Sequence, residues 1–270
     1  MPKTSRQRPV VTRPGFWGIL IGAVVAVAAV VIMVLNAKVY NAESMVEDYV
    51  AALRAGDGST AMALSQGYLS DSAPESISTV LLDGDALAAA AAMLDDAEIV
   101  ATDAEVPESF RDDAVAQQVV EIRYQDAHDQ AYSTSIVVDK VGTSWVFFNV
   151  WQLHPLPLQQ VELAPLQMPE HAKADEPVAH VNAEPTPLLG TNGAPATLAA
   201  FAPSRIALEY EGTYLEVAEP VELIAQDVLA AGAHTDFEFE VKPTQAVDDA
   251  ITQEVQQQLQ RCTQQQVLKP

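Results

Sequence analysis

The stretch around Tyr124, Asp126 and His128 is where the sequence comes nearest to acid–base chemistry. A tyrosine hydroxyl and a carboxyl group in an apolar pocket can stabilise a developing oxyanion, and a carboxylate or an imidazole can take up a proton. Asp126 and His128, however, fall in the polar run 125–130, which we expect to form a hairpin loop. Tyr124 then belongs to the preceding strand. These residues predict a solvated loop and a strand aromatic rather than a catalytic site.

Paired acidic residues are the next candidates, because carboxylates bind cations. Asp95 and Asp96, like Asp112 and Asp113, are sequence neighbours, and neighbouring side chains on a helix or strand point in different directions. The triplet Asp83-Gly84-Asp85 begins like a calcium-binding loop but lacks the Glu at the twelfth position. A calcium ion also needs about 6–8 oxygen ligands. The acids therefore predict a solvated surface rather than a metal site.

Metal and nucleophile motifs are absent from the sequence. The single cysteine excludes a cysteine-based zinc site and an internal disulfide. Ser135 and Ser144 lack the G-x-S-x-G context of a hydrolase nucleophile, and neither a phosphate-binding loop nor G-x-G-x-x-G occurs. Four histidines show no H-E-x-x-H or H-x-H spacing: His154, His171, His180 and His234. We therefore predict no catalytic, cofactor-binding or metal-binding residue, and no cofactor.

The charge of the chain is divided between two regions. It has 37 acidic and 14 basic side chains, a formal charge of −23, yet no acid precedes Glu43. Residues 1–42 carry five bases: Lys3, Arg6, Arg8, Arg13 and Lys38. The remaining 37 acids against nine bases give residues 43–270 a formal charge of −28. Such a body repels polyanions, which argues against nucleic-acid binding.

An uncharged apolar run extends from Phe16 to Leu35. Twenty residues at about 1.5 Å each span roughly 30 Å, the thickness of a bilayer core, so we predict a transmembrane helix at 16–37. The bases before it predict a cytoplasmic tail at 1–15 and an extracytoplasmic body. Gly18 and Gly22 form a GxxxG pair, a weak signal for helix pairing. The alternative is a cleavable signal peptide. Its apolar region is usually shorter than this run, and cleavage after Ala37 would place Leu35, which is not a small residue, at the −3 position.

Helices followed by strands predict an α+β domain over residues 38–152. Val46, Tyr49, Val50 and Leu53 have the spacing of one helix face, and a short helix and a third helix at 86–94 follow. Predicted strands at 98–101, 115–124, 132–138 and 144–151 come next, with a turn at 140–143. This order is typical of an antiparallel meander that closes over helices.

The motifs VEDYVAALRAGDGSTAMAL and EIRYQ…YSTSIVVDKVGTSWVFFNV carry a resemblance to a known family. Residues 40–152 resemble an NTF2-like (cystatin-like) domain, in particular those that follow a single membrane anchor in bacterial envelope proteins. The resemblance implies a cone made of a long helix and a bent sheet. Because this fold serves many unrelated functions, the resemblance implies no activity.

A proline-rich region begins after this domain. We predict a proline-containing linker at 153–160 and a β-rich domain at 161–243, because short β-like segments recur there between Pro and Gly turns, including the turn 188–193. The domain resembles the Ig-like or carboxypeptidase-regulatory-like modules of some envelope proteins and implies a small β-sandwich-like fold.

A C-terminal amphipathic helix is predicted at 244–270. Its apolar positions step along one face: Val247, Ile251, Val255, Leu259 and Cys262. Three interpretations of Cys262 stay open, namely a buried thiol, a disulfide between two chains, and a natural chain that continues into a further module.

These observations predict a single-pass type II membrane protein of the bacterial cell envelope, with a non-catalytic binding or scaffolding body outside the membrane. Expected partners are the membrane, other envelope proteins, cell-wall material or a cationic ligand, and binding would use the cone or a domain seam. The alternatives are an enzyme with its active site in the cone, or a spacer or sensor stalk for a module beyond residue 270.

Overall fold

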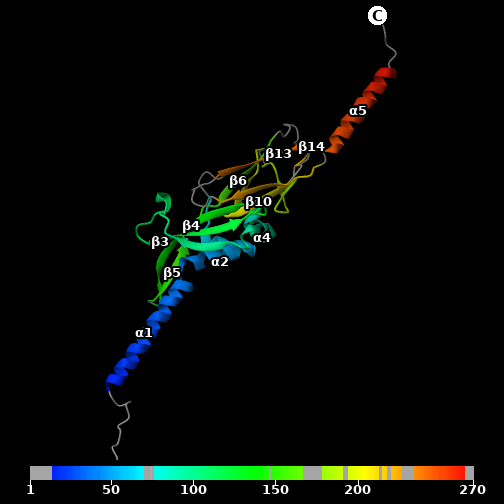
Figure 1. Cartoon of the computed structure of the whole chain (residues 1–270). Coiled ribbons are helices and arrows are strands. Elements are labelled where there is room, and N and C mark those ends of the chain that lie inside the picture. Colours follow the sequence, from blue (N-terminus) through cyan, green and yellow to red (C-terminus); the bar gives the residue numbers. More distant parts are fainter. Residues whose placement is uncertain are drawn as a thin grey trace, which may run out of the picture.

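The fold is α+β, as predicted. The computed structural model describes residues 14–69, 74, 76–145, 147–166, 178–190, 194–212, 215–217, 220–226 and 234–264. An apolar helix, α1 (Pro14–Lys38), leaves the sheet-rich body at one end, and α5 (Gln245–Gln264) leaves it at the opposite end (Figure 1). Within α1, Trp17–Lys38 is long and apolar enough to cross a membrane, by length and composition. Most of the predicted cytoplasmic tail lies outside the described residues.

The N-terminal part of the body packs helices against an antiparallel sheet. The sheet has the order β2-β3-β4-β5. Its strands are β2 (Glu98–Thr102), β3 (Ala116–Gln125), β4 (Ala131–Ser144) and β5 (Phe148–Leu153). The helices are α2 (Ala42–Arg54), α3 (Gly58–Ser65) and α4 (Gly84–Ala91), with 3-10 turns η2 (Val80–Leu82), η3 (Ala92–Leu94) and η4 (Glu108–Phe110).

Helix α2 forms where the apolar spacing predicted it. Asn41 caps its N-terminus by accepting a hydrogen bond from the Ser44 amide at 3.0 Å. The predicted face is buried, with Val46 and Leu53 fully inaccessible to solvent. These side chains share one hydrophobic core with Ile122 of β3 and Ile136 of β4. Burial of the stripe against the sheet therefore stabilises the helix.

The turn between β4 and β5 lies later in the chain than predicted. The turn prediction at 140–143 is wrong, since these residues continue β4 and pair with β5. A bulge between Lys140 and Gly142 absorbs one residue and preserves the pairing beyond it. The chain reverses after Ser144, whose carbonyl accepts a hydrogen bond from the Phe147 amide at 3.2 Å. The predicted loop between β3 and β4 is confirmed.

The C-terminal part contains two four-stranded sheets, ordered β1-β9-β6-β13 and β12-β10-β7-β8, and a small pair β11-β14. The first sheet comprises β1 (Ile77–Ser78), β9 (Thr197–Ala200), β6 (Gln159–Leu166) and β13 (His234–Glu240). The second comprises β12 (Val221–Ala225), β10 (Ser204–Glu209), β7 (Val178–Val181) and β8 (Glu184–Pro187). The small pair is β11 (Leu215–Glu216) and β14 (Lys242–Pro243). Both large sheets contribute to a second core, which includes Leu163, Leu198, Ile206 and Phe237.

The two parts of the body are joined by buried contacts. Residues 153–160, where we predicted a linker, are packed: Leu156 and Leu158 belong to the first core, and their amides bond to the Ser65 and Tyr68 carbonyls. The Tyr49 hydroxyl of α2 donates to the Ala202 carbonyl at 3.0 Å. Strand β1, which lies between α3 and α4 in the sequence, pairs with β9 of the C-terminal part. The chain thus crosses between the two parts more than once.

Helix α5 confirms the predicted C-terminal helix over its described residues, 245–264. Ile251, Val255 and Leu259 on its apolar face are exposed. Cys262 is a free and exposed thiol, so the interpretation of a buried thiol is wrong. The reason is that α5 projects away from the body (Figure 1) instead of packing on it. Residues 265–270 lie outside the described residues.

Candidate functional site

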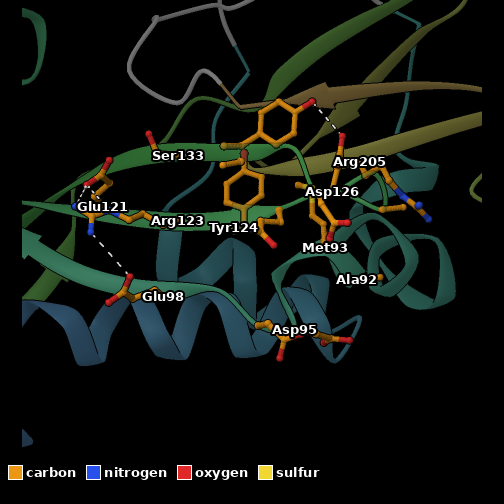
Figure 2. A pocket seen from close by; sticks show the side chains of 16 residues that line it. Ala92, Met93, Asp95, Glu98, Glu121, Arg123, Tyr124, Asp126, Ser133 and Arg205 are labelled. Carbon is orange, nitrogen blue, oxygen red and sulfur yellow. Dashed lines mark hydrogen bonds and ion pairs between the residues drawn. The ribbon is translucent and has the colours of Figure 1, made fainter.

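A concave pocket of about 870 Å³ lies beside the β3–β4 hairpin. Three elements line it: η3 with the chain leading into β2, the end of the hairpin, and β10 of the C-terminal part. Figure 2 shows Glu121, Arg123 and Glu98 joined by dashed lines on one side of Tyr124, with Asp126 and Arg205 on the other. Because Arg205 comes from the second sheet, the pocket lies at the seam between the two parts of the body.

The lining of the pocket is acidic. Six described lining residues are carboxylates: Asp95, Asp96, Glu98, Glu121, Asp126 and Asp129. The lining has two described cations, Arg123 and Arg205. Six negative charges against two positive ones leave a formal charge of −4. Charge on this scale attracts cations and repels anions, and the concave shape strengthens the field.

Both arginines already have carboxylate partners. Arg123 bonds to Glu121 at 2.7 Å and lies 3.9 Å from Glu98. The hydrogen bond from Arg123 lowers the pKa of Glu121. Arg205 lies 3.3 Å from Glu222, which is outside the described lining. Asp95 lies 2.8 Å from Arg54, which is outside the described lining. The two lining cations therefore do little to neutralise the other lining acids, Asp96, Asp126 and Asp129.

Hydrogen bonds hold the hairpin loop in one conformation. Asp126 accepts from the backbone amides of His128 and Gln130, at 2.8 and 2.9 Å, and from the Tyr132 hydroxyl at 3.2 Å. These bonds, led by the one from Gln130, lower the pKa of Asp126. The carboxylate thus stays ionised at any pH near neutral. Asp129 follows with a left-handed backbone, φ 61°, a conformation that Asp tolerates better than most residues.

Two tyrosine rings form the wall between the acids. Tyr124 and Tyr132 are stacked, with ring centroids 5.9 Å apart. Tyr124 is buried, hydrogen-bonds with Thr134 at 3.1 Å, and has its pKa raised to about 12 by burial. The hydroxyl is therefore neutral at pH 7. Aromatic faces next to carboxylates are the surroundings that organic cations prefer.

The structure brings together residues that the sequence analysis treated separately. Tyr124 and Asp126 line the same pocket as Asp95 and Asp96, although about 30 positions separate the two groups. His128 lies exposed in the loop and is not among the described lining residues. Asp112 accepts a bond from the Ala114 amide at 2.9 Å within its own turn. Asp83 bonds to the Gly58 amide at 3.0 Å, so this acid serves the fold.

Sequence reasoning missed Glu98, Glu121, Arg123 and Arg205. Glu121 and Arg123 are two positions apart on a predicted strand, so their shared face was readable from the sequence. Arg205 was not, because it enters from another sheet. Ser133, a lining residue, hydrogen-bonds to Glu121. Among the described lining residues, no histidine stands beside this serine to act as a base.

The other histidines lie in separate places. His154 contacts Asp139, with Nδ1 and Oδ2 at 2.9 Å, and His180 contacts the Ala183 carbonyl at 3.4 Å. His171 lies outside the described residues. His234 Nε2 lies 3.5 Å from Glu162 and 3.1 Å from Asp236, because β6 and β13 are neighbouring parallel strands.

Glu162, His234 and Asp236 form the group whose atoms could hold a metal ion within the described part of the chain. The sequence search missed it because Glu162 comes from a different strand. Its ligand atoms lie within 4.8 Å of one another, but His234 and Asp236 are exposed. Exposed side chains of opposite charge make contacts of the same length in ordinary surface ion pairs, so this geometry alone does not favour a metal.

Comparison of the chain with protein-family models, curated proteins and solved structures finds no match in any of the three. The resemblance of residues 40–152 to NTF2-like domains therefore stays a prediction.

Proposed function

We propose that this protein is a single-pass, membrane-anchored binding protein of the bacterial cell envelope, with a non-catalytic extracytoplasmic body whose acidic pocket binds a cationic ligand. The observation that carries the proposal is the pocket at the seam, with a formal charge of −4 and a wall of two tyrosines. Its volume of about 870 Å³ suits a small organic molecule or a peptide segment.

Contacts between α1 and the body support a retained anchor rather than a cleaved signal peptide. The Asn36 side chain bonds to the Phe147 carbonyl at 2.7 Å and accepts from the Asn149 amide at 3.1 Å. Trp151 donates its Nε1–H to the Tyr40 carbonyl at 3.0 Å. Cleavage after Ala37 would remove the Asn36 contacts. The basic residues before α1 support the type II orientation.

We further propose that residues 40–152 form an NTF2-like domain, and the packing of α2 on the sheet supports both this and the non-catalytic part of the proposal. A helix that packs on an antiparallel sheet agrees with the long helix and bent sheet that the resemblance implies. The space between them is occupied by buried apolar side chains, including Val46, Leu53, Ile122 and Ile136. A filled interior leaves no room there for a substrate, which makes the seam pocket the better binding site. The shared core of the two C-terminal sheets likewise supports a sandwich-like module.

Titration of the full chain in detergent micelles with the tetra-amine spermine tests the proposal. Asp96→Asn with Asp129→Asn removes two lining charges without changing side-chain size. An exposed charge pair contributes up to about 1 kcal/mol, so the loss of two pairs, about 2 kcal/mol, should weaken spermine binding by up to about thirtyfold. The matched control, Asp103→Asn with Asp113→Asn, removes the same charge from exposed residues outside the described lining. It should stay within about twofold, since screening weakens distant charges.

Two results would contradict the proposal. Equal weakening by both double variants would mean that spermine responds to the net charge rather than to the pocket. Binding that does not change between low and high salt would refute the electrostatic argument, because screening must weaken attraction between exposed charges.

A further inference from the structure

Exposed aromatic side chains mark the tip of the β4–β5 hairpin. Trp145 is 85% exposed and Phe147 is 57% exposed. Val141, in the strand β4 that leads to the tip, is 51% exposed. Large apolar side chains are normally buried, and an exposed group of them indicates a surface that another phase or molecule covers. Trp145 also has a left-handed backbone, φ 51°, which is unfavourable for a bulky residue.

The tip lies level with the end of the apolar run of α1. Asn36, the first polar residue after that run, bonds to the backbone of Phe147 and Asn149. Farther into the body, the Tyr40 ring packs on Phe148 with centroids 4.6 Å apart. The hairpin therefore runs beside the end of α1 (Figure 1), and its turn points toward the apolar run.

The tip also differs from the rest of the body in charge. Residues 140–151 contain Lys140 and no acidic side chain, whereas residues 43–270 as a whole carry a formal charge of −28. Because the tip lies beside the end of the apolar run of α1, carboxylates here would lie against the membrane surface, and their loss of hydration would cost free energy. Tryptophan, in contrast, favours the layer where lipid headgroups meet the hydrocarbon. The composition of the tip fits a lipid surface.

We propose that the tip of the β4–β5 hairpin inserts Trp145 and Phe147 into the outer headgroup layer of the membrane that α1 crosses. This inference rests on the proposed membrane anchor. A single helix leaves the body free to tilt, and a second contact at the tip limits that freedom. The tip therefore sets the orientation of the body, and with it the direction in which the seam pocket opens.

Tryptophan quenching by brominated lipids tests the inference with the full chain in phosphatidylcholine vesicles. The chain has three tryptophans: Trp17 in α1, Trp145 at the tip and Trp151 in β5. Three proteins suffice: W17F, W145F and the double variant W17F/W145F, which retains Trp151 alone. The difference between W17F and the double variant reports Trp145. The difference between W145F and the double variant reports Trp17.

We expect bromines near the headgroups to quench Trp145 more strongly than bromines near the chain ends, with Trp151 much less affected. Quenched Trp17 with unquenched Trp145 would overturn the inference and leave the anchor intact. Unquenched Trp17 would instead refute the anchor. Quenching of Trp151 as strong as that of Trp145 would mean that the whole sheet lies on the membrane, and would also overturn the inference. A blue-shifted emission of Trp145 without quenching would show that protein, not lipid, covers the tip, and it would also overturn the inference.

Discussion

Replacement of Tyr49 by phenylalanine removes one hydroxyl from the contact that joins the two parts of the body. Tyr49 is 1% exposed, lies in the first core, and donates to the carbonyl of Ala202, which is itself 3% exposed. Its ring meets Phe201 edge to face at 6.3 Å. Burial raises the pKa of Tyr49 far above its ordinary value, so the hydroxyl is a neutral donor at all moderate pH.

The expected cost follows from the buried carbonyl that loses its partner. Phenylalanine keeps the ring contacts, and the loss is therefore confined to the hydrogen bond. A buried acceptor left without a donor costs about 1–3 kcal/mol. We expect Tyr49→Phe to lower the free energy of unfolding by that amount. Because Tyr49 touches both parts, the transitions of both should shift together.

Urea unfolding of the full chain in detergent micelles measures this quantity. Far-UV circular dichroism follows the sheets of both parts, and tryptophan fluorescence, measured in the W17F/W145F background, follows Trp151 in the N-terminal sheet. The control is Tyr68→Phe, since Tyr68 is 41% exposed and should cost less than about 0.5 kcal/mol. If Tyr49→Phe matches this control, or shifts one probe and not the other, the coupling argument is wrong.

Two further predictions concern the packing of α3 and the acidity of the pocket. A Cβ on Gly58 would overlap the backbone carbonyl oxygen of Leu82, so Gly58→Ala should lower the free energy of unfolding by about 3 kcal/mol in the same urea assay. The control is Gly142→Ala, whose Cβ meets no atom of the described residues within 4 Å and which should change that free energy by less than about 0.5 kcal/mol. Hydrogen bonds lower the pKa of Asp126 and of Glu121 below the ordinary values of these carboxyl groups, so both stay charged at mildly acidic pH. Spermine affinity should therefore be constant from about pH 7, where the amines of spermine are protonated, to about pH 5, and should decline only below about pH 4. A decline centred between pH 6 and 7 would instead implicate a histidine.

Elements governed by local periodicity were predictable from the sequence. The α2 face, the apolar run of α1 and the strand around Ile122 depend on spacings within a few residues, and the structure has them where the patterns predicted. The β4–β5 turn was misplaced because Gly142 resembles a turn residue. Its actual role is to continue a strand past a bulge, which depends on pairing with Val150. A signal that depends on a partner strand cannot be read from one segment.

The candidate site divides in the same way. Asp95, Asp96, Tyr124 and Asp126 were visible as single residues, and each one by itself was most simply a surface acid or a strand aromatic. Folding places η3 beside the β3–β4 hairpin and adds Arg205 from β10, which turns scattered acids into one concave surface. The same holds for Glu162 and His234, which meet through the parallel pairing of β6 and β13. Which side chains meet across two strands depends on the register of their pairing, and the composition of either strand alone does not encode that register.

Composition and order alone established the division of charge, the apolar run and the α+β class, because each is a property of continuous chain. Tertiary structure decided which carboxylates face one another, that residues 153–160 are packed between the cores, and that an acid-free aromatic tip stands level with the end of α1. These are contacts between residues far apart in the chain. Their geometry arises only when the apolar faces of both parts are buried together, since that burial sets how the elements lie against one another.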